Sequence, residues 1–355
     1  MNNTQSYLLT EYAHAAGCGC KIAPAVLQEM LHASETITEP SKNLIIGNEG
    51  FEDAAVMELP DGNALISSTD FFSPIVDDAF DFGRIAAANA ISDIYAMGGR
   101  PILALGILGW PVDKIPPAIA GKVMEGAKMI CQQAGIPLAG GHSIDAPEPF
   151  FGLSVNGLAA KNSIKRNNTL QEGDLIFLTK PIGSGVLSTA LKRKQLSEED
   201  YKELIDWITQ LNSIGAILGE KEWVHALTDV TGFGLLGHLI EMIGDHAFSI
   251  ELFYKQIPVI ESAKQYLSRQ IVPDATYRNW NHYHTQVEFG ENINVMEAFN
   301  LLPDPQTNGG LLIAVPQNAV QSVTELFANH QLSRFVKPIG KVVTAKSKKI
   351  SVIVG

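Results

Sequence analysis

Apolar positions in the first half of the chain recur with both strand and helix periods. Continuous or alternating apolar runs predict strands at 54–59, 64–70, 102–110 and 150–159. Apolar residues at helical spacing predict helices at 24–32, 82–97 and 117–134. The turn Pro60-Asp61-Gly62-Asn63 predicts a hairpin between the first two strands, and the turn-rich stretch 138–149 predicts a loop.

The second half repeats this mixture of periods. Strands are predicted at 174–180, 311–315, 335–342 and 349–354. Helices are predicted at 185–194, 198–218 and 318–329. Residues 225–244 predict a strand end, a glycine turn and a helix, whereas 272–300 show little periodicity.

The segment 161–173 shifts sharply toward polar and basic residues and predicts a boundary between domains. We therefore expect a flexible, glycine-rich N-terminal segment over 1–45, one domain over 46–160 and a second over 174–355. Because strands and helices are interspersed in both halves, the fold class is α/β or α+β.

Composition excludes several classes of protein. Of the 355 residues, 46% are apolar and 18% are charged, which is enough to bury a full core. The net charge of −12 and the lack of a long basic patch argue against a nucleic-acid partner. No apolar run is long enough to span a bilayer and no signal peptide is visible, so neither a membrane nor secretion is expected. Three cysteines do not form a disulfide framework, and a cytoplasmic protein is expected.

The string Gly17-Cys18-Gly19-Cys20-Lys21 gathers thiols and an ammonium group on a backbone that glycine makes flexible. A neighbouring lysine raises the thiolate fraction of a cysteine, so the string predicts a loop that folds over a reaction. Alternatives are half of a zinc site, a redox pair and two idle thiols. No supporting ligands occur at zinc spacing, and redox pairs normally have the spacing CxxC.

Spaced carboxylates form the second chemical feature. Asp53 precedes a predicted strand, Asp70 ends the next, and Asp229 follows a strand in the second half. Asp93 lies in an alanine-rich helix with Asn89 four residues earlier, so both side chains fall on one face. Magnesium takes oxygen ligands and keeps substrate phosphates in its shell, which makes these residues candidates for phosphate chemistry. Each aspartate alone is equally compatible with capping a turn.

Three glycine-containing turns are candidates for contacts with phosphate oxygens. They are Gly140-Gly141-His142-Ser143, Gly183-Ser184-Gly185 and Thr231-Gly232-Phe233-Gly234. None matches a Walker A loop or a complete dinucleotide fingerprint, so the commonest nucleotide folds are excluded.

Seven strings resemble those of the selenophosphate synthetases, also called selenide, water dikinases. They are AGCGCK (16–21), DAAV (53–56), STDFF (68–72), FDFGRIAAANAISDIYAMGG (80–99), AGGHSIDAPEP (139–149), TDVTGFGLLGH (228–238) and DPQTNGG (304–310). The resemblance implies two mixed-sheet domains of the aminoimidazole-ribonucleotide-synthetase type, flanked by helices and assembled as a homodimer, with ATP and magnesium bound by 46–160. It implies the reaction of ATP, selenide and water to selenophosphate, AMP and orthophosphate, which supplies selenium for selenocysteine and selenonucleosides.

The same resemblance implies roles for individual residues. Cys18 and Lys21 are the catalytic pair. Cys18 either holds or delivers selenium or positions selenide near the phosphate, and the first role is favoured because a soft thiolate suits a soft element. Cys20 is expected to be auxiliary. The implied metal ligands are Asp53, Asp93 and Asp229. The implied nucleotide contacts are Lys21, Gly50, Phe51, Glu52, Asp70, Asp93, Gly141, His142 and Ser143. A selenium-delivery protein is an implied partner.

The chain departs from the family pattern at three positions. Glu52 stands where an aspartate is frequent, Phe51 where a polar or basic residue is frequent, and Asn308 where serine is common. Two other readings remain open: a different ATP-dependent enzyme of the same superfamily, and a non-catalytic selenium carrier.

Overall fold

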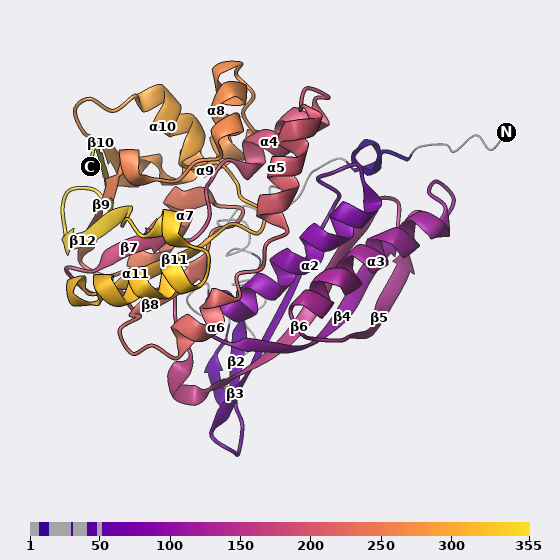
Figure 1. Cartoon of the computed structure of the whole chain (residues 1–355), viewed down its shortest axis with the longest axis horizontal. Helices are drawn as coiled ribbons and strands as arrows, with labels where there is room; N and C mark the ends of the chain where they lie inside the picture. Colours follow the sequence, from indigo (N-terminus) through magenta and orange to yellow (C-terminus); the bar gives the residue numbers. More distant parts are fainter. Residues whose placement is uncertain (1–6, 14–29, 31–40, 48–51) are drawn as a thin grey trace.

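The computed structural model describes residues 7–13, 30, 41–47 and 52–355. Within these residues the strands form a six-stranded sheet, here sheet A, and a seven-stranded sheet, here sheet B. Every strand of sheet A lies within 44–160 and every strand of sheet B within 175–353. Both sheets mix parallel and antiparallel pairs, and helices flank them, as the family resemblance implies (Figure 1).

Sheet A has the strand order β1-β2-β3-β6-β4-β5. Its strands are β1 (Leu44–Ile46), β2 (Ala55–Glu58), β3 (Asn63–Phe72), β4 (Arg100–Trp110), β5 (Leu138–Asp145) and β6 (Phe150–Ala160). The predicted hairpin is confirmed, because β2 pairs antiparallel with β3 across the turn at 60–63. The strands predicted at 102–110 and 150–159 are confirmed as β4 and β6.

Helix α2 (Ala79–Ala96) lies between sheet A and the C-terminal half of the chain (Figure 1). The Asp78 carboxylate caps it by accepting a bond from the Asp81 N–H, and Gly98 follows its end with a φ of +75°. Most of α2 is buried, as expected for a helix that is apolar nearly all round. The helices predicted at 82–97 and 117–134 are thus confirmed as α2 and α3 (Pro117–Gln133).

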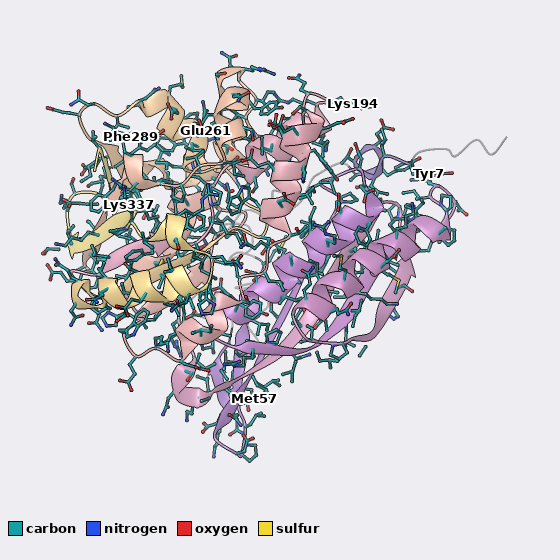
Figure 2. All side chains as sticks on the ribbon, viewed as in Figure 1. Tyr7, Met57, Lys194, Glu261, Phe289 and Lys337 are labelled. Atoms are coloured by element: carbon teal, nitrogen blue, oxygen red, sulfur yellow. The ribbon has the colours of Figure 1, made fainter. Side chains whose placement is uncertain are left out.

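Polar contacts hold the C-terminal half against α2. The Arg84 guanidinium donates to Thr209 Oγ1 at 2.9 Å, and the Tyr201 hydroxyl donates to Asp81 at 2.8 Å. At the same end of the molecule, Lys194 Nζ lies 2.6 Å from the Glu11 carboxylate of the 3-10 helix η1 (Leu9–Tyr12), with Lys194 labelled in Figure 2. Helix α2 is therefore held to the C-terminal half through α5 (Glu198–Ile208) and the residue that follows it.

The loop predicted at 138–149 is wrong over most of its length, because β5 occupies 138–145. Strand β5 pairs parallel with β4 at the edge of sheet A, and its residues are mostly exposed. An exposed strand lacks the apolar alternation that a sequence pattern can detect. Gly141 has a φ of +151°, and a Cβ there would lie 2.0 Å from the Gly106 carbonyl oxygen of β4, so only glycine fits.

Sheet B has the strand order β10-β13-β9-β12-β7-β11-β8. Its strands are β7 (Leu175–Leu178), β8 (Ala226–Asp229), β9 (Phe248–Phe253), β10 (Val287–Phe289), β11 (Leu311–Val315), β12 (Gly340–Thr344) and β13 (Ile350–Ile353). The helices of this half are α4 (Ser184–Lys192), α5 (Glu198–Ile208), α6 (Ile214–Gly219), α7 (Gly234–Ile243), α8 (Glu261–Ser268), α9 (Asp274–Tyr283), α10 (Val295–Leu301) and α11 (Val320–Asn329).

Two predictions for this half are wrong, and one stretch without a clear pattern contains helices. The single helix predicted at 198–218 is two helices, α5 and α6, because the backbone leaves the helix at 209–213. Residues 272–300 contain α9 and α10, although they show little periodicity. The strand predicted at 335–342 begins only at Gly340, since residues Ser333–Phe335 form a 3-10 turn.

The segment 161–173 contains one 3-10 turn, η3 (Lys161–Ser163), and otherwise no helix or strand. It is nevertheless well anchored, since Lys165 Nζ donates to the Lys221 and Val224 carbonyl oxygens at 2.7 and 3.0 Å. The division into 46–160 and 174–355 remains a prediction. Across the described residues, no helix combines the length and apolar character that crossing a membrane requires.

Candidate active site

Carboxylates from both halves of the chain approach one another beside α2. Asp53 precedes β2, Asp93 lies in α2, and Asp229 ends β8. The Thr228 hydroxyl donates to Asp53 Oδ1 at 3.1 Å, which joins β8 of sheet B directly to the start of β2. Three aspartates that are widely separated in the sequence therefore share one region of the molecule.

The pKa of Asp53 reflects the closeness of these carboxylates. Burial raises the pKa of Asp53 well above its ordinary range, and the neighbouring charges of Asp229 and Asp93 raise it further, while the bond from Thr228 opposes the shift. Asp53 Oδ2 is buried and has no hydrogen-bond partner among the described residues. A buried carboxylate oxygen facing other carboxylates is unfavourable unless a cation offsets it, and this is the pattern expected at a functional site.

Asn89 and Asp93 lie on one face of α2, as their spacing predicts, and both reach β3. The Asn89 side-chain amide donates to Asp70 Oδ2, and the Ser68 hydroxyl donates to Asp93 Oδ2. Ser68 and Asp70 are two residues apart on one strand, so their side chains point to the same side of sheet A. Asp70 and Asp93 thus lie along the same contact between α2 and β3.

Ser92 and Asn212 are two site residues that sequence reasoning misses. The Ser92 hydroxyl donates to Asp229 Oδ2, and Asn212 Nδ2 donates to Ser92 Oγ at 2.8 Å and to the Gly309 carbonyl at 2.9 Å. The sequence marks Ser92 only weakly, as a polar residue in an alanine-rich helix. It does not mark Asn212, because Asn212 falls within the helix predicted at 198–218.

The Glu52 side chain points to the linker between the halves. Its Oε2 accepts a bond from the Asn167 N–H at 3.0 Å, and Arg166 Nη1 lies 3.9 Å from Oε1. The side chain is 1% exposed, and burial raises its pKa, which Asn167 and Arg166 partly offset. A nucleotide contact at position 52 would therefore involve the backbone.

The donor set suits magnesium, although it does not form a closed cage. Within 7–13, 30, 41–47 and 52–355, no three His, Cys, Asp or Glu side chains converge tightly enough to hold a metal ion by themselves. Magnesium is commonly held by one or two carboxylates, with waters and substrate phosphates completing its shell. The orphaned Asp53 oxygen and the neighbouring Asp93 and Asp229 fit such an open site.

The segment Gly141-His142-Ser143 lies apart from these aspartates. Across sheet A, Asp70 is level with Leu153 of β6, Leu153 with Gly106 of β4, and Gly106 with Gly141 of β5. Three strand spacings of about 4.8 Å place Gly141 roughly 14 Å from Asp70. The structure does not bring this predicted contact segment to the carboxylates within one chain.

Protein groups already occupy the other two glycine turns. Gln306 Oε1 accepts from the N–H groups of Gly183 and Ser184, and Asp304 Oδ2 accepts from Gly185, so two side chains cap the start of α4. The turn before α7 is held by the His238 ring, whose Nε2 accepts the Thr231 N–H at 3.0 Å. The N–H groups of Gly183, Ser184, Gly185 and Thr231 are therefore already satisfied by side chains, which corrects the expectation from sequence for these donors.

Replacing Asp304 with Asn should remove a pH dependence of stability. Burial raises the pKa of Asp304 to about 8, so the folded protein holds a proton that the unfolded chain has lost above its ordinary pKa of 3.8. The stabilisation that results from this difference in protonation is complete below pH 3.8 and is lost as the pH rises through about 8.

Urea unfolding of the wild type and Asp304→Asn at pH 5 and pH 8 checks this prediction. Between pH 5 and pH 8, the free energy of unfolding of the wild type should fall by about 3 kcal/mol relative to that of Asp304→Asn. The reason is that a full proton is worth about 1.4 kcal/mol per pH unit. Burial lowers the pKa of Lys180 to about 7, an effect of opposite sign that cancels in the difference. A difference that does not change with pH would contradict the prediction.

Several predicted residues lie outside the described part of the chain. They are Cys18, Cys20, Lys21, Gly50, Phe51 and nearly all of the helix predicted at 24–32. Cys131 is described, and it is buried in α3, where burial raises its thiol pKa to about 11. A buried thiol of this kind is inert, as expected for a core residue.

The comparisons with protein families agree with this architecture. Residues 51–159 match the model of the N-terminal domain of AIR synthase related proteins, and residues 171–353 match that of their C-terminal domain. The thiamine-monophosphate kinase of Stenotrophomonas maltophilia K279a has a similar fold, with a TM-score of 0.61 and 17% identity over 94% of this chain and 96% of that one. Fold and site thus define a two-domain protein of the AIR synthase related class.

Sequence comparison with individual proteins identifies one family within this class. The selenide, water dikinase of Shewanella sp. (strain MR-4) is 49% identical over 94% of this chain and 93% of that protein. That of Shewanella sp. (strain W3-18-1) is 50% identical over 92% of both chains. The chain belongs to the selenide, water dikinase family, the selenophosphate synthetases, and it is an enzyme.

Proposed function

We propose that the protein transfers the γ-phosphoryl group of ATP to selenide and hydrolyses the remaining β-phosphoryl bond, releasing selenophosphate, orthophosphate and AMP. Selenophosphate would supply activated selenium for selenocysteine and selenonucleosides. The observation that carries the proposal is the convergence of Asp53, Asp93 and Asp229 from both halves of the chain. Such a group has no structural benefit of its own, since like charges destabilise one another.

Asp53, Asp93 and Asp229 would hold magnesium, which neutralises phosphate charge and aligns the phosphates when bound. The hydroxyl groups of the chain orient these carboxylates. Ser68 donates to Asp93, Ser92 donates to Asp229, and Thr228 donates to Asp53. Bonds of this kind fix the orientation of each ligand.

Asp70 would contact the nucleotide beside these carboxylates, since Asn89 holds it on the same side of sheet A. Gly50, Phe51 and Glu52 would contribute backbone contacts at the entry to β2. Gly141, His142 and Ser143 stay candidates for a contact from the exposed edge of sheet A.

Cys18 and Lys21 would act on the selenide side of the reaction. The Lys21 ammonium would add positive charge between two anions, ATP and selenide, that otherwise repel each other. A closing loop would exclude water from the first phosphoryl transfer, so that selenide rather than water attacks. The Cys18 thiolate would hold or deliver selenium, because a soft sulfur ligand suits a soft element.

We further propose a homodimer that buries the open face of sheet A. Helices α2 and α3 cover one face of this sheet (Figure 1), whereas the other carries exposed apolar side chains. They include Met57, labelled in Figure 2, Phe71, Leu105 and Ile144. Exposed apolar side chains gathered on one sheet face are typical of an interface.

The substitution Leu105→Glu in the middle of this face should convert the dimer to a monomer in sedimentation velocity. Met124→Glu, at a similarly exposed position of α3, is the matched control and should leave the dimer intact. A wild-type monomer, or a Leu105→Glu dimer of unchanged affinity, would exclude this interface.

We also propose a cytoplasmic protein that receives selenium from a delivery protein. Free selenide is readily oxidised, and thiols persist in a reducing compartment.

Product analysis tests the proposed function. Purified protein is incubated with ATP, magnesium and selenide, and the products are followed by phosphorus NMR. The proposal predicts selenophosphate, AMP and orthophosphate in equal amounts. ADP as the final nucleotide product would instead indicate another ATP-dependent enzyme of the superfamily, and no ATP turnover would indicate a selenium carrier.

A further inference from the structure

Asn308 occupies an unusual backbone conformation in the loop that joins α10 to β11. Its φ is +47°, in the left-handed region that asparagine tolerates better than most residues. Asn308 is 1% exposed, so this conformation is fixed by the protein interior rather than by solvent. Such positions are retained where the surrounding structure holds them in place.

Three hydrogen bonds hold Asn308 in place. Its side-chain Nδ2 donates to the carbonyl oxygens of Ile208 and Gln210, both at 2.9 Å. The buried Lys180 ammonium donates to the Asn308 carbonyl at 2.9 Å and to the Gln210 carbonyl at 2.7 Å. The end of β7, the break after α5 and the loop before β11 are thereby joined at one residue.

The backbone N–H of Asn308 points at α2, where it donates to Asn89 Oδ1 at 2.7 Å. The oxygen and nitrogen of a side-chain amide lie in one plane, on opposite sides of the Cβ–Cγ bond. Once Asn308 engages the oxygen, the Asn89 nitrogen must face the other way, toward Asp70, to which it donates. The Asn308 N–H thus favours the orientation of the Asn89 amide in which its nitrogen faces Asp70.

We propose that Asn308 is a positioning residue for ATP, acting through the Asn89 amide on the Asp70 carboxylate. The inference rests on the proposed function, in which Asp70 contacts the nucleotide. Asparagine meets both requirements of position 308, because it tolerates a positive φ and supplies two side-chain donors. Serine has a single, shorter donor and cannot reach both the Ile208 and Gln210 carbonyls.

The same loops also support Ser92, the residue that donates to Asp229. Asn212, two residues after Gln210, bonds both to Ser92 and to the carbonyl of Gly309, the neighbour of Asn308. Asn308 is connected to Asp70 through one residue, Asn89. Its connection to Asp229 needs Gly309, Asn212 and Ser92, so a displacement of Asn308 should affect Asp70 more than Asp229.

Two substitutions test the proposal. Asn308→Gly keeps the positive φ and the backbone N–H but removes the side-chain bonds to the Ile208 and Gln210 carbonyls. Asn308→Ser replaces these two donors with one on a shorter side chain. The dissociation constant of a β,γ-methylene ATP analogue with magnesium should rise about tenfold in each, as expected for the loss of about one well-placed hydrogen bond. The Michaelis constant for ATP should rise similarly, with a smaller change in kcat.

Asn292, with a φ of +63° at an exposed site, is the matched control. The variants Asn292→Gly and Asn292→Ser should bind the analogue as the wild type does.

A double-mutant cycle separates positioning from a merely structural role. In an Asp70→Asn background, Asn308→Gly should weaken analogue binding no further, since its effect passes through the Asp70 carboxylate. Additive losses, or a variant that is less stable yet binds the analogue normally, would overturn the inference. Because analogue binding does not require selenide, a wild type that binds nucleotide but forms no selenophosphate would refute the proposed function and leave this test intact.

Discussion

Replacing Asp53 with Asn is expected to stabilise the fold while abolishing ATP turnover. Burial and the charges of Asp229 and Asp93 raise the pKa of Asp53, so its ionised form is disfavoured in the folded protein. The neutral amide removes that repulsion and keeps the acceptor for the Thr228 hydroxyl. We expect the free energy of unfolding to rise by about 1 kcal/mol, as is common when a functional constraint is removed.

The activity should change in the opposite direction. Loss of a charged ligand at a magnesium and phosphate site removes several kcal/mol of transition-state stabilisation, which is about a thousandfold in rate. Urea unfolding and AMP formation are measured on the same preparations, with Asp113→Asn as a control that removes one exposed charge. If Asp53→Asn were both less stable and fully active, the carboxylate cluster would be structural.

Replacing Cys18 with Ser should abolish selenide-dependent AMP formation and leave nucleotide binding within about twofold of the wild type. A serine hydroxyl stays protonated at neutral pH and is a hard ligand, so it cannot take over the handling of selenium. Selenide-dependent AMP formation and analogue affinity are the two readouts. Cys20→Ser is the matched control from the same loop and should keep much of the activity. Full activity in Cys18→Ser would show that the reaction does not need this thiol.

The sequence predicts the elements with strong periods. Helix α2 and strands β4, β6 and β11 are found where their apolar patterns lie. It fails where regular structure depends on partners. Strand β5 exists because its backbone pairs with β4, and the helix predicted at 198–218 breaks where Asn212 turns inward to bond Ser92.

For the site, the sequence identifies the carboxylates and misses the residues that support them. Asp53, Asp93 and Asp229 stand out because an isolated carboxylate is costly in apolar surroundings. Lys180 and Asn308 give no such signal, since their role depends on carbonyl groups from distant loops. The Glu52 side chain could not be assigned from sequence, because its partner lies in the linker.

A crystal structure with a non-hydrolysable ATP analogue and magnesium tests the central claim most directly. We expect carboxylate oxygens of Asp53, Asp93 and Asp229 within about 2.1 Å of magnesium ions that also contact the phosphates of the analogue. Phosphates bound elsewhere, or magnesium held without these three residues, would contradict it.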